Sequence, residues 1–155
     1  MVNLIIRQFK DSDLSDVVKL NKLALQAEDA FIERPILDED LKNIKNIYLR
    51  NQGEFLVATL NKKIIAMGAL QKSTKRTAKL KRIRVHPKYQ RKGIGQALLN
   101  ILEEKAKQTG YKNIILTTLK RQRKAQKFYE KNKYIKYREG SEHGFKTLYY
   151  KKLLD

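Results

Sequence analysis

The chain contains no cysteine and only two histidines among its 155 residues. The absence of cysteine excludes a disulfide framework, a thiolate metal site and a cysteine nucleophile. Two histidines are too few for a multi-histidine site, so no metal is expected. Long apolar runs are missing as well, and the start from Met1 to Lys10 has only a short apolar part, interrupted by Asn3 and Arg7. These absences favour a cytoplasmic domain with no signal peptide and no membrane segment.

Acidic residues are scarce after residue 55. The chain has 35 Lys and Arg against 16 Asp and Glu, a net charge of +19. Residues 1–55 hold 8 basic and 10 acidic side chains, whereas residues 56–155 hold the other 27 basic and only 6 acidic ones. A basic field attracts nucleic acid, anionic membrane surfaces or phosphorylated cofactors. Biased codon usage is the alternative source of the excess, although it explains the two-part asymmetry less well.

The apolar pattern predicts one domain of alternating strands and helices. A hydrophobic content of 41% suffices for one core, and the length favours a single domain over residues 1–155. Strands are expected over 3–9, 54–60, 64–71, 79–86, 113–119, 134–138 and 145–152, and helices after 11–13 and over 39–49, 94–108 and 122–131. Antiparallel strands followed by a strand–helix–strand unit predict an α+β domain, a mixed three-layer fold with helices on both faces of one sheet.

One strand departs from regular alternation. Leu80, Ile83 and Val85 change parity, so they share a face only if an extra residue is inserted between the first two. We therefore predict a β-bulge near Lys81 and Arg82, and bulges concentrate beside active sites. A strand buried on both faces at that end is the alternative.

A turn with two glycines leads from this strand into the strongest predicted helix. Gly93 and Gly95 leave the backbone N–H groups unobstructed, and the helix amino terminus adds a partial positive charge. The turn therefore predicts an anion site suited to phosphate. It lacks the third glycine of a dinucleotide fingerprint and the Gly-Lys-Ser/Thr of a Walker loop. Taken alone, the turn is also compatible with a plain helix cap.

With its flanks, this turn resembles the pyrophosphate-binding segment of the GNAT superfamily of N-acetyltransferases. A strand ends in Val85-His86-Pro87, and Gln90-Arg91-Lys92-Gly93-Ile94-Gly95 opens the long helix. A second segment, Ala125-Gln126-Lys127-Phe128-Tyr129-Glu130-Lys131, is similar to a later helix of the family. The element order matches too, so the resemblance covers essentially the whole chain. It implies a central mixed, mostly antiparallel sheet with a splayed parallel strand pair, and acyl-CoA N-acyltransferase activity with acetyl-CoA as acyl donor.

The resemblance also implies a role for each matching residue. The backbone of residues 83–85 would pair with the pantetheine arm of acetyl-CoA like an added strand, and the N–H groups of residues 91–96 would hold its pyrophosphate. Tyr129 would be the catalytic residue that protonates the departing thiolate, with a plain core aromatic as the alternative. The implied cofactor-binding residues are Ile83, Arg84, Val85, Gln90, Arg91, Lys92, Gly93, Ile94, Gly95, Gln96, Gln122 and Tyr129.

Three positions depart from the family's pattern. Lys79 stands where many members have a glutamate that deprotonates the amine through water, so the general base is unassigned. Gln122 replaces the usual asparagine at the start of the last helix and could still reach the cofactor arm. Lys133 replaces a glycine after that helix, and Asn132 is expected to take the left-handed position instead.

The acceptor side of the cleft is expected at the segment that joins the first two helices. Residues 28–40 hold six carboxylates against one arginine, and clustered carboxylates attract cations. We therefore expect a positively charged amine, such as a polyamine, an aminoglycoside-like amine or a basic peptide. The acceptor-binding candidates are Glu28, Asp29, Phe31, Glu33 and, in the loop between the last two strands, His143; one of the three acids could be the missing base. Ordinary acidic residues in the first turn of the second helix are the alternative.

Two functions therefore remain open. The first is acetyl transfer from acetyl-CoA to a primary amine of a small molecule or peptide. The second is a nucleic-acid or ribosome-associated binding module on the same fold, with a vestigial cofactor site. Residues 71–92 favour the second with ten Lys and Arg and no acid, but Tyr89 is the only aromatic residue there that could stack on bases. A homodimer is compatible with either function.

Overall fold

The computed structural model describes residues 3–28 and 35–155. Within these residues, seven strands form one sheet in the order β1-β2-β3-β4-β5-β7-β6. The strands are β1 (Leu4–Gln8), β2 (Glu54–Leu60), β3 (Lys63–Lys72), β4 (Thr77–Val85), β5 (Asn113–Leu119), β6 (Ile135–Glu142) and β7 (Phe145–Leu153). Neighbouring strands are antiparallel except β4 and β5, which are parallel.

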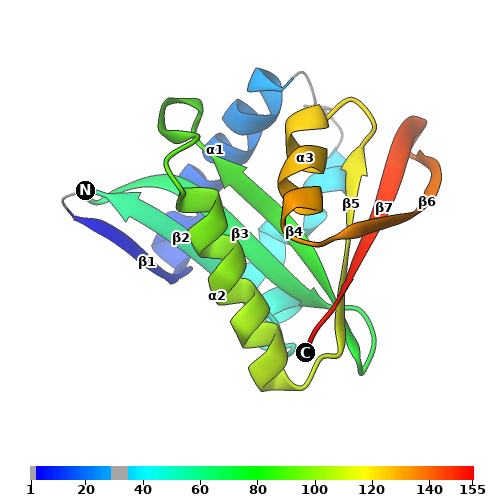
Figure 1. Cartoon of the computed structure of the whole chain (residues 1–155). Coiled ribbons are helices and arrows are strands. Elements are labelled where there is room, and N and C mark those ends of the chain that lie inside the picture. The colour runs from blue at the N-terminus through cyan, green and yellow to red at the C-terminus, as the bar shows by residue number, and fades with distance from the viewer. Residues whose placement is uncertain (1–2, 29–34) are drawn as a thin grey trace.

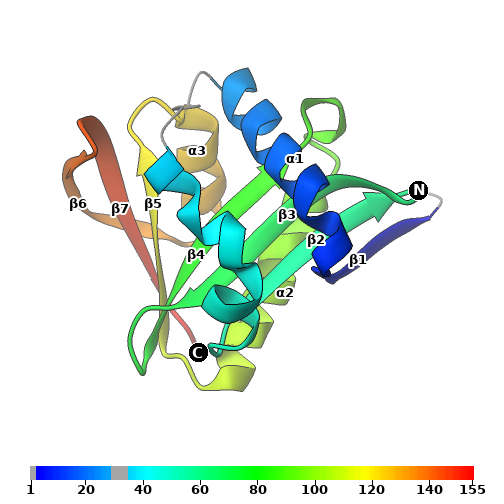
Figure 2. The same ribbon diagram turned by 180° about the vertical axis from the view of Figure 1, so that it is seen from behind.

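Helices cover both faces of this sheet, which confirms the predicted three-layer fold. On one face lie α1 (Leu14–Ala27), the 3-10 segment η2 (Pro35–Asn43) and the π-helical turn η3 (Lys45–Leu49). On the other face lie α2 (Ile94–Thr109) and α3 (Arg123–Lys131), as Figures 1 and 2 show from opposite sides. Two short 3-10 turns, η1 (Asp11–Asp13) and η4 (Pro87–Tyr89), precede α1 and α2. In the described part of the chain, no helix is long and apolar enough to cross a membrane.

Each face of the sheet has its own hydrophobic core. Under α2, the fully buried Leu98, Leu99 and Leu102 pack over Ile65 of β3 and its neighbours. Under α1 and η3, the core is built by Phe9, Val17, Leu20, Leu41, Ile44, Tyr48, Phe55, Val57, Ile64, Met67 and Ala69. Helices therefore pack against both faces of the sheet across β2–β4. This packing fixes α2 and α3 relative to the strand edges that form the site.

The segment predicted as a helix over 39–49 is helical, but it consists of a 3-10 part and a π-helical turn instead of a regular α-helix, and a non-helical residue stands just before it. The 3-10 segment η2 contains Asp38 in a non-helical conformation, with φ −117° and ψ 15°, and the π-helical turn η3 follows. Two carboxylates two residues apart point to different sides of a regular helix. Here Asp38 and Asp40 both reach Arg82 of β4, which the non-helical conformation of Asp38 allows.

Two further differences from the prediction concern positive φ angles. The strand predicted over 134–138 extends to Glu142, so β6 and β7 are joined by a tight turn in which His143 and Gly144 have φ of 53° and 83°. After α3, the left-handed position is taken by Lys133 (φ 75°), not by Asn132 (φ −91°) as predicted. The N–H of Lys133 donates to Glu130 O at 3.1 Å, and Tyr134 N–H donates to Tyr129 O at 3.0 Å, so the helix end is closed in spite of the unusual residue.

Candidate active site

A cleft opens where the parallel strands β4 and β5 diverge. The two strands pair only from Thr77 to Lys79 and from Asn113 to Ile115, and beyond these residues they separate. The cavity at this point has a volume of about 920 Å³. It is lined by residues of β4, β5, α1, η2, the start of α2, α3 and the β6–β7 turn. On its β5 side, β4 therefore has an unpaired backbone edge from residue 80 onward, which can accept an extended molecule as an added strand.

The predicted β-bulge is confirmed and divides the cleft into two sides. Arg82 has a positive φ of 63°, and the pairing of β4 with β3 shifts between the partners Met67 and Ala69. As a result Ile83 and Val85 pack toward the α2 core together with Leu80. The charged residues of the strand point to the α1 face, where Arg82 meets Asp40 and Arg84 meets Asn21.

The turn before α2 presents backbone N–H groups to the cleft. Arg91 and Gly93 have positive φ angles of 62° and 82°, and the first N–H to bond back into the helix is that of Ala97, to Gly93 O at 3.0 Å. The N–H groups of residues 94–96 consequently have no acceptor within the helix. The Gln90 side chain ties the turn to the strand by donating from Nε2 to Val85 O at 3.3 Å.

Neither the packing nor the backbone conformation of the protein itself requires glycine at position 95. An added Cβ at Gly95 would lie 3.6 Å from Val85 Cγ2 and 3.9 Å from Phe128 Cζ, which are ordinary contact distances. The protein's own packing therefore tolerates a side chain at this position. Lysines of α3 face the cleft from the opposite side of the turn: Lys124, Lys127 and Lys131. Free N–H groups, a helix amino terminus and these cations together fit a pyrophosphate.

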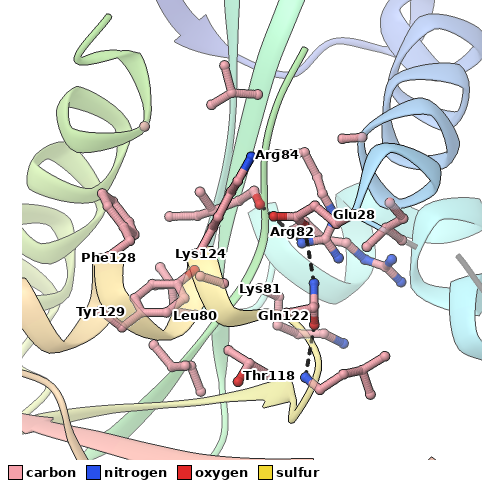
Figure 3. A pocket seen from close by; sticks show the side chains of 18 of the residues that line it. Glu28, Leu80, Lys81, Arg82, Arg84, Thr118, Gln122, Lys124, Phe128 and Tyr129 are labelled. Atoms are coloured by element: carbon pink, nitrogen blue, oxygen red, sulfur yellow. Dashed lines mark hydrogen bonds between the residues drawn. The ribbon is translucent and has the colours of Figure 1, made fainter. Parts of the chain in front are cut away.

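Tyr129 of α3 places its hydroxyl in the cleft (Figure 3). The side chain is buried, and its ring contacts Phe128 and Tyr134 with centroid distances of 5.2 and 5.6 Å. Burial raises the pKa of Tyr129 to about 12, and the nearby charge of Arg84 opposes this increase only in part. Tyr129 therefore keeps its proton at neutral pH, as a proton donor must.

A second hydroxyl in the cleft lies on β5. Thr118 is buried, it lines the cavity, and its Oγ1 has no hydrogen-bond partner among the described residues. A buried hydroxyl without a partner is unfavourable unless a ligand or water completes its hydrogen bonds. Sequence reasoning missed Thr118, although alternation from Ile114 and Leu116 places it on the same face of the strand.

Gln122 connects the end of β5 to the end of α1. Its Oε1 accepts from the backbone N–H of Leu119 at 2.9 Å, and its Nε2 donates to Glu28 Oε2 at 3.4 Å, as the dashed lines in Figure 3 mark. This places the Glu28 carboxylate at the cleft, where sequence analysis expected an acceptor residue. The Gln122 amide uses both its oxygen and its nitrogen in these hydrogen bonds. It therefore positions Glu28 and also adds a polar group to the cleft.

A buried ion-pair network forms the wall of the cleft on the α1 face. Arg82 donates from Nε and Nη2 to the two oxygens of Asp40, at 3.1 and 2.5 Å, and from Nη1 to Asp38 Oδ1 at 3.0 Å. The hydroxyl of Tyr48 donates to Asp40 Oδ2 at 2.5 Å. Burial by itself would raise the pKa of Asp40, but the hydrogen bonds and charge of Arg82 outweigh burial and hold this pKa below its ordinary value. Asp38 and Asp40 are thus neither helix-dipole residues nor free acceptor-binding acids.

The structure brings together most of the residues that the sequence singled out. The cleft is lined by Ile83, Arg84, Val85, Gln90, Arg91, Gly93, Gly95, Gln96, Gln122, Tyr129, Glu28 and His143. Ile94 buries its side chain in the core and Lys92 is exposed outside the cavity, so these two residues can contribute only through the backbone or at a distance. The acceptor candidates Asp29, Phe31 and Glu33 lie outside the described residues.

The fold that positions this cleft is shared with known proteins. The family model for the acetyltransferase (GNAT) family matches residues 20–134, so the chain belongs to this family of N-acetyltransferases, which are acyl-CoA N-acyltransferases. No curated protein sequence matches the chain.

Three solved structures show how far the fold is shared. An acetyltransferase from Streptococcus agalactiae 2603 is 22% identical with a TM-score of 0.91, and the match covers 99% of this chain and 100% of that one. The paia N-acetyltransferase from Thermoplasma acidophilum in complex with coenzyme A is 21% identical with a TM-score of 0.78 over 96% and 98%. The yncA structure from Salmonella typhimurium with its cofactor acetyl-CoA is 18% identical with a TM-score of 0.80 over 98% and 94%.

Proposed function

We propose that this single-domain protein transfers an acetyl group from acetyl-CoA to a primary amine of a small molecule or peptide. The observation that carries the proposal is the cleft between β4 and β5, which joins an unpaired strand edge to an amide-lined turn at the start of α2. An extended arm with a pyrophosphate at its end matches both parts. Coenzyme A and acetyl-CoA are bound by two neighbours of the same fold, which supports this donor.

The residues of the chain divide the work of binding and chemistry. Acetyl-CoA supplies the activated thioester. The backbone of residues 83–85 holds the arm as an added strand, and the N–H groups of residues 91–96 hold the pyrophosphate. Tyr129 Oη holds a proton that it can donate to the departing sulfur, since a phenol remains protonated where a thiol of pKa about 8.5 is formed.

The amine must lose its proton before it attacks. Two described carboxylates, Glu28 and Glu142, line the cleft without an ion-pair partner among the described residues. Glu142 accepts the hydroxyl hydrogen of Tyr149, whereas Glu28 is held at the end of β5 by Gln122. Lys79, which stands where many family members have a glutamate, cannot serve as a carboxylate base. We therefore assign the base to Glu28, acting directly or through a water molecule.

The structure pairs three of the carboxylates on which a cationic acceptor was expected, leaves Glu28 at the cleft, and does not describe Asp29 and Glu33. Of the six carboxylates in residues 28–40, Asp38 and Asp40 are paired with Arg82, and Glu39 pairs with Lys42 at the surface. Paired carboxylates contribute little net field at the cleft. The kind of acceptor is therefore argued separately below.

The proposed function is tested by binding and by thiol release. In calorimetry at about 0.15 M salt, acetyl-CoA should bind and a short DNA duplex should bind far more weakly. Addition of a primary amine should release free thiol from acetyl-CoA. Tight binding of the duplex together with no binding of acetyl-CoA would instead support the nucleic-acid module, for which the structure adds no further argument.

Gly93→Val should weaken acetyl-CoA binding by about tenfold or more, about 1.4 kcal/mol. An added Cβ at Gly93 meets no atom within 4 Å, so the effect does not come from crowding inside the protein. It comes from the φ of 82°, which a β-branched residue avoids, so the turn shifts and its N–H groups move. The dissociation constant is measured by calorimetry.

Gly110→Val is the matched control for this change. Gly110 ends the same helix α2 with a φ of 99°, and an added Cβ there also meets no atom within 4 Å. The backbone cost is therefore similar, but the position is about 24 Å away along a 16-residue helix. Acetyl-CoA affinity should be unchanged in Gly110→Val. Equal affinity in a folded Gly93→Val protein would remove the turn from the cofactor site.

A further inference from the structure

Three cations of β4 line the α1 side of the cleft without a carboxylate partner. Lys79 and Lys81 precede the bulge and Arg84 follows it, and all three border the cavity. In residues 3–28 and 35–155, no carboxylate lies within ion-pair distance of any of them. Arg84 donates only to neutral groups, from Nε to Asn21 Oδ1 and from Nη1 to Ile83 O, both at 3.1 Å.

These cations are unfavourably placed for the stability of the folded chain. Burial is the main cause that lowers the pKa of Lys81; the charge of Asp40 opposes this decrease, and the like charges of Arg82, Lys79 and Arg84 add to it. Burial is also the main cause that lowers the pKa of Arg84, to about 10. Like charges held together in a half-buried site cost free energy unless an anion compensates them. Asp38 and Asp40, which lie near these cations, are already paired with Arg82, and Glu28 acts on Arg84 only at a distance.

The position of the cations separates them from the pyrophosphate turn. Ile83 and Val85, on the other side of the same strand, pack toward α2, whereas Asp40 influences Lys81 and Asn21 binds Arg84 on the α1 face. The turn over residues 91–96 therefore lies across the sheet from the cations. Arg84 instead lies near α1, where it binds Asn21 and is influenced by Glu28.

A second cavity, of about 360 Å³, also borders Lys79. It shares Lys79 and Thr117 with the first cavity and is lined in addition by Tyr137, Arg138 and Tyr149 of the last two strands. Arg138 lies over the Tyr149 ring at 4.0 Å and so adds a fourth cation at the far end. An acceptor that extends in this direction would lie near Arg138 and also near the carboxylate of Glu142, which accepts from the Tyr149 hydroxyl.

We propose that Lys79, Lys81 and Arg84 bind an acidic group of the acceptor, so that the acceptor is an amine that also carries a carboxylate or phosphonate-type anion. This inference rests on the proposed acetyl transfer and names its substrate class. The amine is held at Glu28 and the acidic group lies on the cations of β4. The charge of the acceptor is then opposite to the one expected from the carboxylates of residues 28–40.

The test compares four-carbon amines that differ in the charge of one end. Thiol release is measured with 4-aminobutyrate, its neutral amide 4-aminobutanamide and the cationic 1,4-diaminobutane, and 3-aminopropylphosphonate distinguishes a phosphonate from a carboxylate. The specificity constant for one of the two acidic amines should exceed that of the neutral amide by about tenfold or more. A hexapeptide whose free α-amine is followed by two carboxylate side chains, compared with its amide counterpart, distinguishes a peptide acceptor from a small molecule.

Lys81→Gln tests the site directly. The ratio of specificity constants for the preferred acidic amine and 4-aminobutanamide should fall by about tenfold, with the change mainly in KM. Lys81→Gln should fold normally, because it removes an unpaired, half-buried cation. Lys75→Gln, an exposed lysine between β3 and β4, is the matched control and should leave the ratio unchanged. An equal ratio in Lys81→Gln and in the unaltered protein would overturn the proposal.

A binding readout separates this inference from the proposed function. Affinity of 4-aminobutyrate and of 1,4-diaminobutane is measured by calorimetry on the CoA-loaded protein, which has no acetyl group to transfer. If acetyl-CoA is turned over but 1,4-diaminobutane binds and reacts best, the anion site is wrong and the acetyltransferase stands. If no amine releases thiol but 4-aminobutyrate binds and Lys81→Gln weakens it, the anion site stands and the proposed reaction is wrong.

Discussion

Tyr129→Phe is expected to lower kcat by about 100-fold or more, which corresponds to about 2.7 kcal/mol in the barrier. The hydroxyl of Tyr129 lies in the cleft and has no hydrogen-bond partner among the described residues. Its removal therefore deletes a proton donor without leaving a buried group of the protein unsatisfied. Acetyl-CoA affinity should stay within about threefold of the unaltered protein, since the ring remains in place. Steady-state thiol release and calorimetry measure the two quantities.

Tyr134→Phe is the matched control. Tyr134 is also buried, and its ring lies 5.6 Å from that of Tyr129, but its hydroxyl donates to Glu103 Oε2 at 2.8 Å on the side away from the cleft. This variant should lose stability and keep kcat. The pH dependence adds a second check, because a pKa of about 12 means that Tyr129 stays protonated throughout the usual assay range and causes no loss of kcat up to about pH 10. A kcat within about threefold in Tyr129→Phe would make this tyrosine structural.

Asp40→Ala is expected to lower the free energy of unfolding by about 3–5 kcal/mol. The change removes both oxygens that accept from Arg82 and the acceptor of the Tyr48 hydroxyl, so a buried guanidinium loses its main counter-charge. Asp38 compensates in part through a single hydrogen bond to Arg82 at 3.0 Å. Urea unfolding measures the difference.

The surface pair of Asp11 and Lys45 provides the control for this change. Their side chains are 72% and 44% exposed, and Asp11→Ala should cost less than about 1 kcal/mol. The pH dependence has a definite sign. Because the pKa of Asp40 is lowered in the folded protein, its contribution is present above the unfolded pKa of about 3.9 and is lost as the pH falls through the folded value. A cost near that of Asp11→Ala would show that Arg82 finds other partners.

The strands and the bulge were within reach of sequence reasoning because their signals are local. The continuous apolar run of β5 gave its bounds, residues 113–119, and the parity change between Leu80 and Ile83 located the bulge that the φ of Arg82 confirms. The glycine turn was predictable because Gly93 can adopt the positive φ that the turn requires. These features depend on a few neighbouring residues, so no information about distant parts of the chain was needed.

The α1 side of the site was predicted less well because its geometry depends on residues far apart in sequence. Asp40 and Arg82 are 42 residues apart, and their pairing reduces the negative charge of the cleft. Counting carboxylates in residues 28–40 therefore gave a negative acceptor side, whereas the ion pairs cancel part of that charge. Likewise, whether the Thr118 hydroxyl finds a hydrogen-bond partner depends on residues that are distant in sequence. The only sign of it in the sequence is the alternation of β5, which places Thr118 on the buried face.

The unpaired edge of β4 has a consequence for self-association. A strand edge inside a sheet is a template on which a segment of another chain can add, which is the first step of aggregation. Here the edge stands between lysines of β4 on one side and lysines of α3 on the other, so a foreign polypeptide must pass through a positively charged opening. Charged side chains beside an exposed edge are a known protection against such pairing. The edge can thus pair with an extended, negatively charged ligand, while the lysines disfavour pairing with another copy of the chain. Because this protection depends on charge, it weakens as salt screens the lysines.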